Sequence, residues 1–242
     1  MSDASPEVGD LTEYRGRVYR IVEAQHRIST NRLADGPAEQ DVIERLVEEA
    51  KPDLPAAARD LHYLLGSAFR YGYAKATRFR SAHERPGIFY ASEQEATAIA
   101  EMAYWRLRFF AASPGMPLPT TSIEHTGLSV LVESRRAIDL AEGRLGAFRD
   151  RWQRSDDYGP TQRLASEARA LEVQLIRYRS VRDEQEGVNV AVLDPAVFTT
   201  RAPRTERTWT FRFFQGELRV FASYPSDEAY RFRFADFGLV HS

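Results

Sequence analysis

Residues 77–105 read TRFRSAHERPGIFYASEQEATAIAEMAYW, and this stretch decides how the fold is interpreted. An arginine-rich segment precedes a short apolar strand over residues 88–91, and a helix over residues 93–110 follows. Glu101 falls on the apolar side of this helix. Its helical neighbours at i−4, i−3, i+3 and i+4 are Thr97, Ala98, Tyr104 and Trp105. An ionised carboxylate facing a core costs several kcal/mol unless it is paired or its pKa is shifted. The upstream arginines could therefore pair with Glu101 in a structural salt bridge, or bind the phosphate of a substrate.

Composition narrows the class of protein. The chain has 242 residues, of which 43% are apolar, so it can bury the core of one large domain. A formal net charge of −2 gives no whole-chain attraction to nucleic acid or to an anionic membrane. No apolar run approaches the roughly 18 residues that span a bilayer, and the start, MSDASPEVGD, lacks the features of a secretory signal. We therefore expect a soluble cytoplasmic protein without direct contact to nucleic acid or membrane.

Hydrophobic periodicity predicts a mixed set of elements. β-branched and aromatic residues favour strands over residues 16–23, 88–91, 126–133, 173–178 and 188–193. Apolar residues at helical spacing favour a short helix through His62 and Leu65 and longer ones over residues 37–50, 93–110 and 162–171. Ser92 and Glu95 fit a capping box, and residues 66–77 have the composition of a loop that lines a site. Because strands and helices do not alternate regularly, the α+β class is favoured.

The expected domain organisation is simple. Residues 1–13 are predicted to be a flexible tail, and residues 14–242 a single domain with its core over about residues 15–200. An additional C-terminal β-hairpin is predicted over residues 205–242, because apolar residues alternate on both sides of the Gln215-Gly216 turn. Arginines alternate with these aromatics, which is a pattern that can bind single-stranded nucleic acid. An ordinary half-exposed sheet gives the same pattern, and the net charge favours that interpretation.

Several common catalytic signatures are absent. The sequence has no GxGxxG, GxxxxGK[ST], GxSxG or HExxH motif. It has no cysteine, which removes disulfides, a cysteine nucleophile and cysteine-ligated metals. The five histidines are scattered without metal-ligand spacing, so we expect no metal site.

Four further positions are candidates for a site. Arg78 and Arg80 straddle Phe79, so in an extended segment both side chains share one face. Tyr90 ends the predicted strand, and Ser180 follows another strand between two arginines. Each has an ordinary structural alternative: a solvated edge for the arginines, a core aromatic for the tyrosine and a turn residue for the serine.

The order and spacing of these residues resemble the RES-domain family, named for its arginine, glutamate and serine. The corresponding stretches are VYRIV with Arg20, TRF with Arg78, GIFYAS with Tyr90, AIAEMAYW with Glu101, YGPTQRLASEAR with Gln162, YRSVR with Ser180 and GVNVAVL with Asn189. The glutamate lies eleven residues after the tyrosine, as in the family, and the resemblance covers about residues 15–200. The family's arginine lies ten residues before the tyrosine, which here is Arg80. The arginine-aromatic pattern falls on Arg78, and we favour Arg78.

The resemblance implies a fold, a substrate and a partner. RES domains are similar to ADP-ribosyltransferase toxins, with central β-sheets flanked by helices, and they act on NAD as toxins of toxin–antitoxin pairs. By this resemblance Arg78, Tyr90, Glu101 and Ser180 would be catalytic, and Arg20, Arg80, Gln162 and Asn189 would help to bind NAD. A cognate antitoxin would block the site, and either a homo-oligomer or a hetero-oligomer with that antitoxin is compatible with the sequence.

The acceptor of the cleaved ribose stays open. Water would make the protein an NAD glycohydrolase, phosphate a phosphorylase, and a protein side chain a mono-ADP-ribosyltransferase. A third interpretation is a non-enzymatic module in which the C-terminal hairpin binds RNA or a partner protein.

Overall fold

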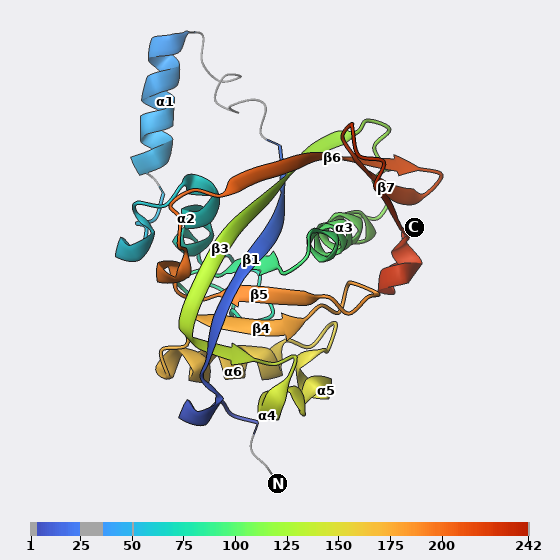
Figure 1. The fold of residues 1–242 in the computed structure, drawn as a ribbon. Helices are drawn as coiled ribbons and strands as arrows, with labels where there is room; N and C mark the ends of the chain where they lie inside the picture. The colour runs from blue at the N-terminus through green and yellow to red at the C-terminus, as the bar shows by residue number, and fades with distance from the viewer. Residues whose placement is uncertain (1–3, 25–35, 50, 242) are drawn as a thin grey trace.

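The computed structural model describes residues 4–24, 36–49 and 51–241. It contains an eight-stranded sheet in the order β1-β2-β5-β4-β3-β6-β7-β8, with β1 also paired to β3 (Figure 1). The strands are β1 (Thr12–Glu23), β2 (Phe89–Ser92), β3 (Ile123–Asp139), β4 (Leu175–Arg179), β5 (Val188–Val192), β6 (Arg204–Phe214), β7 (Glu217–Ala222) and β8 (Ala229–Phe232). The α-helices are α1 (Pro37–Glu49), α2 (Tyr63–Arg70), α3 (Glu95–Ala111), α4 (Gly143–Gly146), α5 (Arg149–Trp152) and α6 (Gly159–Ala170). The predicted α+β class is confirmed.

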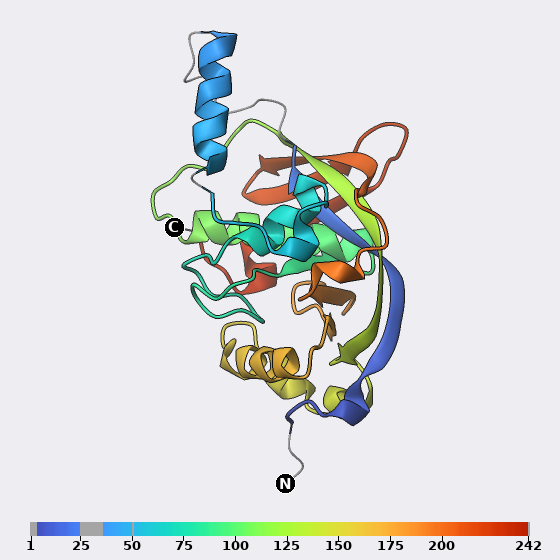
Figure 2. The same cartoon turned by 90° about the vertical axis from the view of Figure 1, so that its left-hand side faces the viewer.

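The long strand β3 connects the two parts of the sheet. It pairs with β1 over most of its length, while its first half pairs with β6 and its last residues run parallel to β4. The strands β1, β2, β5, β4 and β3 therefore surround one region, and β6, β7 and β8 extend from it on the other side of α3. Helix α3 lies between these two groups of strands, as both views show (Figures 1 and 2).

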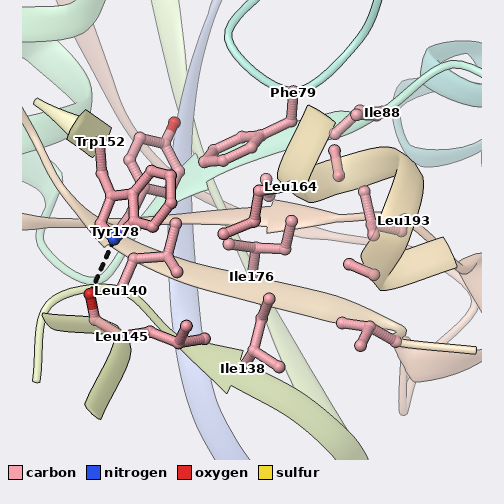
Figure 3. Close-up of a cluster of buried hydrophobic side chains, with 14 of the residues drawn as sticks. Phe79, Ile88, Ile138, Leu140, Leu145, Trp152, Leu164, Ile176, Tyr178 and Leu193 are labelled. Carbon is pink, nitrogen blue, oxygen red and sulfur yellow. Dashed lines mark hydrogen bonds between the residues drawn. The ribbon is translucent and has the colours of Figure 1, made fainter. Parts of the chain in front are cut away.

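Three buried clusters hold these layers together. One packs α6 and Trp152 against the ends of β3, β4 and β5, and Phe79 closes its upper side (Figure 3). A second lies between α2 and the strands β1, β2 and β5. The third joins α3 to β6 and β7 through fully buried side chains that include Ile99, Leu107 and Trp209. Helix α3 is thus fixed on its hairpin side by apolar packing, which leaves its other side for polar chemistry.

The start of the chain differs from the predicted tail. From residue 4 onward the chain makes defined contacts: Ala4 is buried in the first cluster, and Val8–Asp10 forms a 3-10 helix. The Arg144 guanidinium hydrogen-bonds both carboxylate oxygens of Asp10. Residues 4–13 therefore belong to the domain, because an apolar contact and an ion pair anchor them.

The predicted capping box at Ser92 is wrong. Ser92 remains in β2, where its hydroxyl donates to Asn189 Oδ1 at 2.6 Å, and Gln94 occupies the N-cap position of α3 without a side-chain capping hydrogen bond. The Glu95 carboxylate accepts from Trp209 Nε1 at 2.9 Å, so it joins α3 to β6. Tertiary hydrogen bonds have taken the place of the local ones. Residues 66–70, predicted to be loop, complete α2.

The C-terminal strands are more than an added hairpin. Strand β6 pairs with β3 from Ile123 with Phe211 to Ser129 with Arg204, with one register shift between Thr126 and Leu128. The side chains of Trp209, Phe211 and Phe213 are buried against α3. The alternation read from the sequence is therefore that of a sheet with one face in the core.

Helix α1 stands away from the sheet, joined to it through residues that the structure does not describe (Figure 2). The predicted helix over residues 37–50 matches it up to Glu49, and Ala50 lies outside the described residues. Among the helices that the structure describes, none has the length and apolar content to cross a membrane.

Candidate active site

A pocket of about 290 Å³ opens beside α3. Its walls come from β1, the turn at residues 77–80, β2, α3, Tyr158 and the segment that joins β4 to β5. We call it the cleft. Five of the predicted site residues line the cleft: Arg20, Arg78, Tyr90, Glu101 and Asn189. The other three, Arg80, Gln162 and Ser180, lie behind its surface.

Glu101 is held by two neutral donors. Ser180 Oγ donates to Glu101 Oε1 at 2.7 Å, and Asn189 Nδ2 donates to the same oxygen at 2.6 Å. Among the residues that the structure describes, no cation forms an ion pair with Glu101, so the salt-bridge alternative does not hold. Oε2 has no hydrogen-bond partner in that same set. One carboxylate oxygen is therefore fixed by the fold, and the other remains available to a ligand.

Ser180 reaches Glu101 because the turn after β4 packs closely on α3. The backbone N–H groups of Arg182 and Asp183 donate to Ser180 Oγ at 3.1 and 3.2 Å, which leaves its own proton for Glu101. Thr97 Oγ1 donates to Asp183 Oδ2 at 2.7 Å and ties the turn to the start of α3. A Cβ at Gly187 would lie 2.1 Å from Thr97 Oγ1, so only glycine permits this approach.

Asn189 connects Glu101 to the sheet. Its side chain is 1% exposed, its Nδ2 donates to Glu101, and its Oδ1 accepts the Ser92 hydroxyl. The amide is thus oriented by β2 on one side while it orients the carboxylate on the other. A buried polar network whose members all have partners is rigid.

Arg78 lies in the cleft with part of its guanidinium unused. Its Nη1 donates to the carbonyls of Trp152 at 2.6 Å and Arg154 at 3.1 Å, and its guanidinium carbon lies 5.0 Å from the centre of the Tyr158 ring. Both acceptors are neutral carbonyls, so they do not offset the positive charge of Arg78. Since an arginine has five N–H donors, Nε and Nη2 are left for a ligand.

Arg80 has a different environment. Its side chain is 2% exposed and donates to three carbonyls, those of Tyr73, Lys75 and Ser81. The expectation that Arg78 and Arg80 share a face is wrong, because Thr77 and Arg80 pair across a tight turn with Arg78 and Phe79 at its tip. Arg80 stabilises the loop before that turn, and Arg78 points into the cleft.

Tyr90 and Gln162 hold this turn in place. The Tyr90 hydroxyl hydrogen-bonds Thr77 Oγ1 at 2.8 Å and accepts from the Phe79 N–H at 3.2 Å. Burial raises the pKa of Tyr90, which keeps the hydroxyl protonated as a donor. Gln162 Nε2 donates to the Thr77 carbonyl at 2.9 Å. Tyr90 therefore lines the cleft with its ring and supports the turn with its hydroxyl, whereas Gln162 acts only through the turn.

Arg20 brings a further positive charge to the cleft. It lies on β1 with its guanidinium carbon 4.8 Å from the centre of the Phe89 ring. Its Nη1 is buried and has no hydrogen-bond partner among the described residues, and burial lowers its pKa. A buried donor without a partner costs about 1–3 kcal/mol. Within the described chain Arg20 forms no ion pair, so its charge adds to the positive potential that an anionic ligand in the cleft would meet.

Sequence reasoning missed two residues in the walls, Arg182 and Tyr158. Arg182 is 8% exposed and lines the cleft, and its guanidinium carbon lies 3.7 Å from the centre of the Tyr104 ring. Arg182 belongs to the YRSVR stretch, but only Ser180 of that stretch was assigned a role. Tyr158 precedes α6 and packs over Arg78, and nothing in its local sequence pattern indicates this.

The side chains that line the cleft make it electropositive. Arg20, Arg78 and Arg182 line it against the single carboxylate of Glu101. None of the three arginines forms an ion pair within the described part of the chain. In the same residues no group of three or more histidine, cysteine, aspartate or glutamate side chains could hold a metal ion. The arrangement suits an anionic ligand that meets one oriented carboxylate.

Comparisons with known proteins place the chain in a family. Among solved structures, the chain is similar to the M. tuberculosis MbcT–MbcA toxin–antitoxin complex, with 13% identity and a TM-score of 0.46. That match covers 83% of this chain and 86% of the other. No curated protein sequence matches significantly. The family model of the RES domain matches residues 53–213, more than half of the chain, and the protein therefore belongs to the RES-domain family.

Proposed function

We propose that this protein is a toxin of a toxin–antitoxin system that degrades NAD by cleaving the bond between nicotinamide and ribose. The observation that carries the proposal is the environment of Glu101. One carboxylate oxygen is fixed by Ser180 and Asn189, the other has no partner among the described residues, and three arginines without carboxylate partners share its cleft. NAD offers a diphosphate for such cations and a ribose whose bond cleavage develops positive charge.

The chemistry follows from where charge develops. As the C1′–N bond of the nicotinamide ribose breaks, its electron pair leaves with nicotinamide and the ribose takes on oxocarbenium character. A fixed carboxylate nearby stabilises that charge, as in glycoside cleavage. Oε2 of Glu101 is the atom that would face the ribose, since Oε1 is already engaged. Because the carboxylate is pre-oriented, no reorganisation is needed during the reaction.

Arg78 and Tyr90 would bind the two ends of the reacting half of NAD. The free Nε and Nη2 of Arg78 can donate to diphosphate oxygens in charge-assisted hydrogen bonds. The Tyr90 ring lines the cleft and offers a surface on which the nicotinamide ring can stack. Arg20, which also lines the cleft, would add its positive charge near the diphosphate.

Ser180 and Asn189 would act through Glu101. Ser180 Oγ already donates one hydrogen bond and accepts two, so its capacity is used inside the protein. We therefore assign Ser180 a positioning role in place of the catalytic role that the family resemblance implies. Gln162 and Arg80 would position the 77–80 turn in the same indirect way.

The acceptor of the ribosyl group distinguishes three versions of the reaction. Water gives ADP-ribose, phosphate gives a phosphorylated ADP-ribose, and a protein side chain gives a mono-ADP-ribosylated target. All three need the same bond cleavage at Glu101. The cognate antitoxin would act by covering the cleft, because its binding there would exclude NAD.

Measurement of NAD tests the proposal. We expect cellular NAD to fall after induced expression, and the purified protein to consume NAD while releasing nicotinamide. Mass spectrometry of the products with and without phosphate identifies the acceptor. If cellular NAD stays constant and the purified protein leaves NAD intact in both buffers, the proposal is wrong.

A further inference from the structure

Arg182 lines the cleft together with Arg78 and Arg20. We propose that Arg182, together with Arg78, binds the diphosphate of the dinucleotide, and that Arg80 does not. This inference rests on the proposed function, because it names the residues that recognise the diphosphate of the same substrate. It also departs from the expectation that Arg80 helps to bind NAD.

A count of N–H donors separates the two arginines. Arg80 donates from Nη1 and Nη2 to three backbone carbonyls, at 2.6–3.1 Å, and lines no part of the cleft. Arg182 donates from Nη2 to the Ser155 carbonyl at 2.7 Å, which is its one side-chain hydrogen bond in the described structure. Because a guanidinium has five N–H donors, Arg182 keeps four of them and Arg80 two, and the Arg80 donors do not face the cleft.

The orientation of Arg182 is also fixed before a ligand arrives. Its guanidinium carbon lies 3.7 Å from the centre of the Tyr104 ring, the shortest such cation–π distance in the described chain. Stacking on an aromatic face holds the plane of the fork while its N–H groups stay free at the edge. The Tyr104 hydroxyl accepts from Arg108 Nη1 at 2.9 Å, which restrains the ring itself. Less side-chain entropy is then lost when an anion binds.

One short segment holds both cations. The carbonyls of Trp152 and Arg154 accept from Arg78, and the carbonyl of Ser155 accepts from Arg182. Residues 154 and 155 are neighbours, and adjacent Cα atoms are about 3.8 Å apart. Both guanidinium groups are thus anchored to the same short stretch of backbone, residues 152–155. Two forks in that relation match the two phosphates of one diphosphate.

The charge balance supports the same assignment. Arg182 lies in a wall where Glu101 is the only lining carboxylate, and Glu101 makes its hydrogen bonds with Ser180 and Asn189. All of the acceptors that hold Arg78 and Arg182 are neutral carbonyls. A ligand with two negative charges therefore finds two cations whose charge has not been neutralised.

Isothermal titration calorimetry with ADP-ribose tests the inference without requiring turnover. We expect Arg182→Met to weaken ADP-ribose binding about 10- to 100-fold, because charge-assisted hydrogen bonds are lost. Arg182→Lys keeps the charge without the fork and should lose less affinity than Arg182→Met. Arg179→Met is the matched control, since Arg179 lies three residues away and outside the cleft, and it should bind ADP-ribose like the wild type. Adenosine, which lacks the diphosphate, should bind all these proteins equally.

The possible outcomes distinguish the assignment of Arg182 from the proposed NAD cleavage. If wild-type protein cleaves NAD and Arg182→Met binds ADP-ribose as the wild type does, the inference is wrong and the proposed function stands. If wild-type protein binds ADP-ribose in an Arg182-dependent way but never cleaves NAD, the diphosphate site stands and the proposed function fails. If Arg182→Met does not fold, Arg182→Lys carries the test, and wild-type affinity in that variant overturns the inference. A wild-type protein that does not bind ADP-ribose also overturns it.

Discussion

The cleft and the C-terminal strands β6–β8 lie on opposite sides of α3 and use their arginines differently. In the cleft, Arg78 and Arg182 donate to neutral backbone carbonyls. In the C-terminal strands and the turn after them, most arginines lie 2.9–3.9 Å from a carboxylate: Arg204, Arg207, Arg219, Arg231 and Arg233. Arg212 is the exception within the described residues. A neutral carbonyl does not offset the positive charge of an arginine, whereas a neighbouring carboxylate does.

This difference indicates which arginines can attract an anion. Both regions are rich in arginine and aromatic residues, and by sequence both are candidates for a phosphate-binding surface. Exposed ion pairs contribute little to stability, but they lower the local positive potential that a phosphate would meet. The C-terminal strands are therefore better explained as the structural support of α3, and the cleft as the site of chemistry.

The largest expected effect is on the rate of NAD cleavage when Glu101, the glutamate of α3 that lines the cleft, is replaced. Glu101→Gln should lower the rate of NAD cleavage about 1,000- to 10,000-fold, because a neutral amide no longer stabilises the developing positive charge. ADP-ribose binding should change little, since the arginines remain. Single-turnover kinetics and calorimetry measure the two quantities.

Glu95→Gln is the matched control on the same helix. Glu95 accepts from Trp209 Nε1 and lies 3.3 Å from Arg207, on the side of the C-terminal strands. Its substitution should leave the cleavage rate nearly unchanged and reduce stability slightly. Equal losses of activity in the two variants would mean that Glu101 acts only through the fold.

The next effect concerns stability. Trp209→Ala should lower the free energy of unfolding by about 3–5 kcal/mol, because a fully buried indole is replaced by a cavity between β6 and α3. Phe214→Ala changes a residue of the same strand that is 44% exposed, and should cost within about 0.5 kcal/mol. Urea denaturation followed by circular dichroism measures both.

A small loss of unfolding free energy in Trp209→Ala would contradict the interpretation of β6–β8 as the structural support of α3. It would mean that β6–β8 are an appendage whose aromatic face is free for another role, such as binding RNA. A large loss would identify these strands as part of the support for the site, although the RES-domain match ends at residue 213.

Much of this arrangement can be predicted from sequence, for reasons that differ between residues. The alternation of Trp209, Phe211 and Phe213 gives the buried face of β6, because period-two burial is a local property of a strand. The position of Glu101 on its helix indicates a site, because a carboxylate is rarely placed among apolar neighbours without a partner. The resemblance then supplied Ser180 and Asn189, and both contact Glu101.

The remainder depends on contacts that no local pattern records. The tight turn at residues 77–80 decides that Arg78 and not Arg80 enters the cleft. Its hydrogen-bond partners on α6 are more than 80 residues away in the sequence, so no local pattern indicates it. The role of Arg182 depends on its contact with the Tyr104 ring on α3, which the local sequence does not indicate. Ser92 looked like a helix cap because its alternative partner, Asn189, is distant in the sequence. In each case a long-range hydrogen bond or ring contact replaced the expected local one.

The smallest effect tests the arginines directly. Arg78→Met should weaken ADP-ribose binding about 10- to 100-fold, because a cation with free donors in the cleft is lost. Arg231→Met removes an arginine that lies 3.9 Å from Glu217 at the edge of the sheet, and should leave ADP-ribose binding unchanged. Calorimetry at two salt concentrations measures both, and the wild type and Arg231→Met should weaken in parallel as salt rises, while Arg78→Met weakens less. If Arg231→Met loses as much affinity as Arg78→Met, the long-range potential of the whole protein governs binding, and the distinction between carbonyl-held and carboxylate-held arginines has no functional meaning.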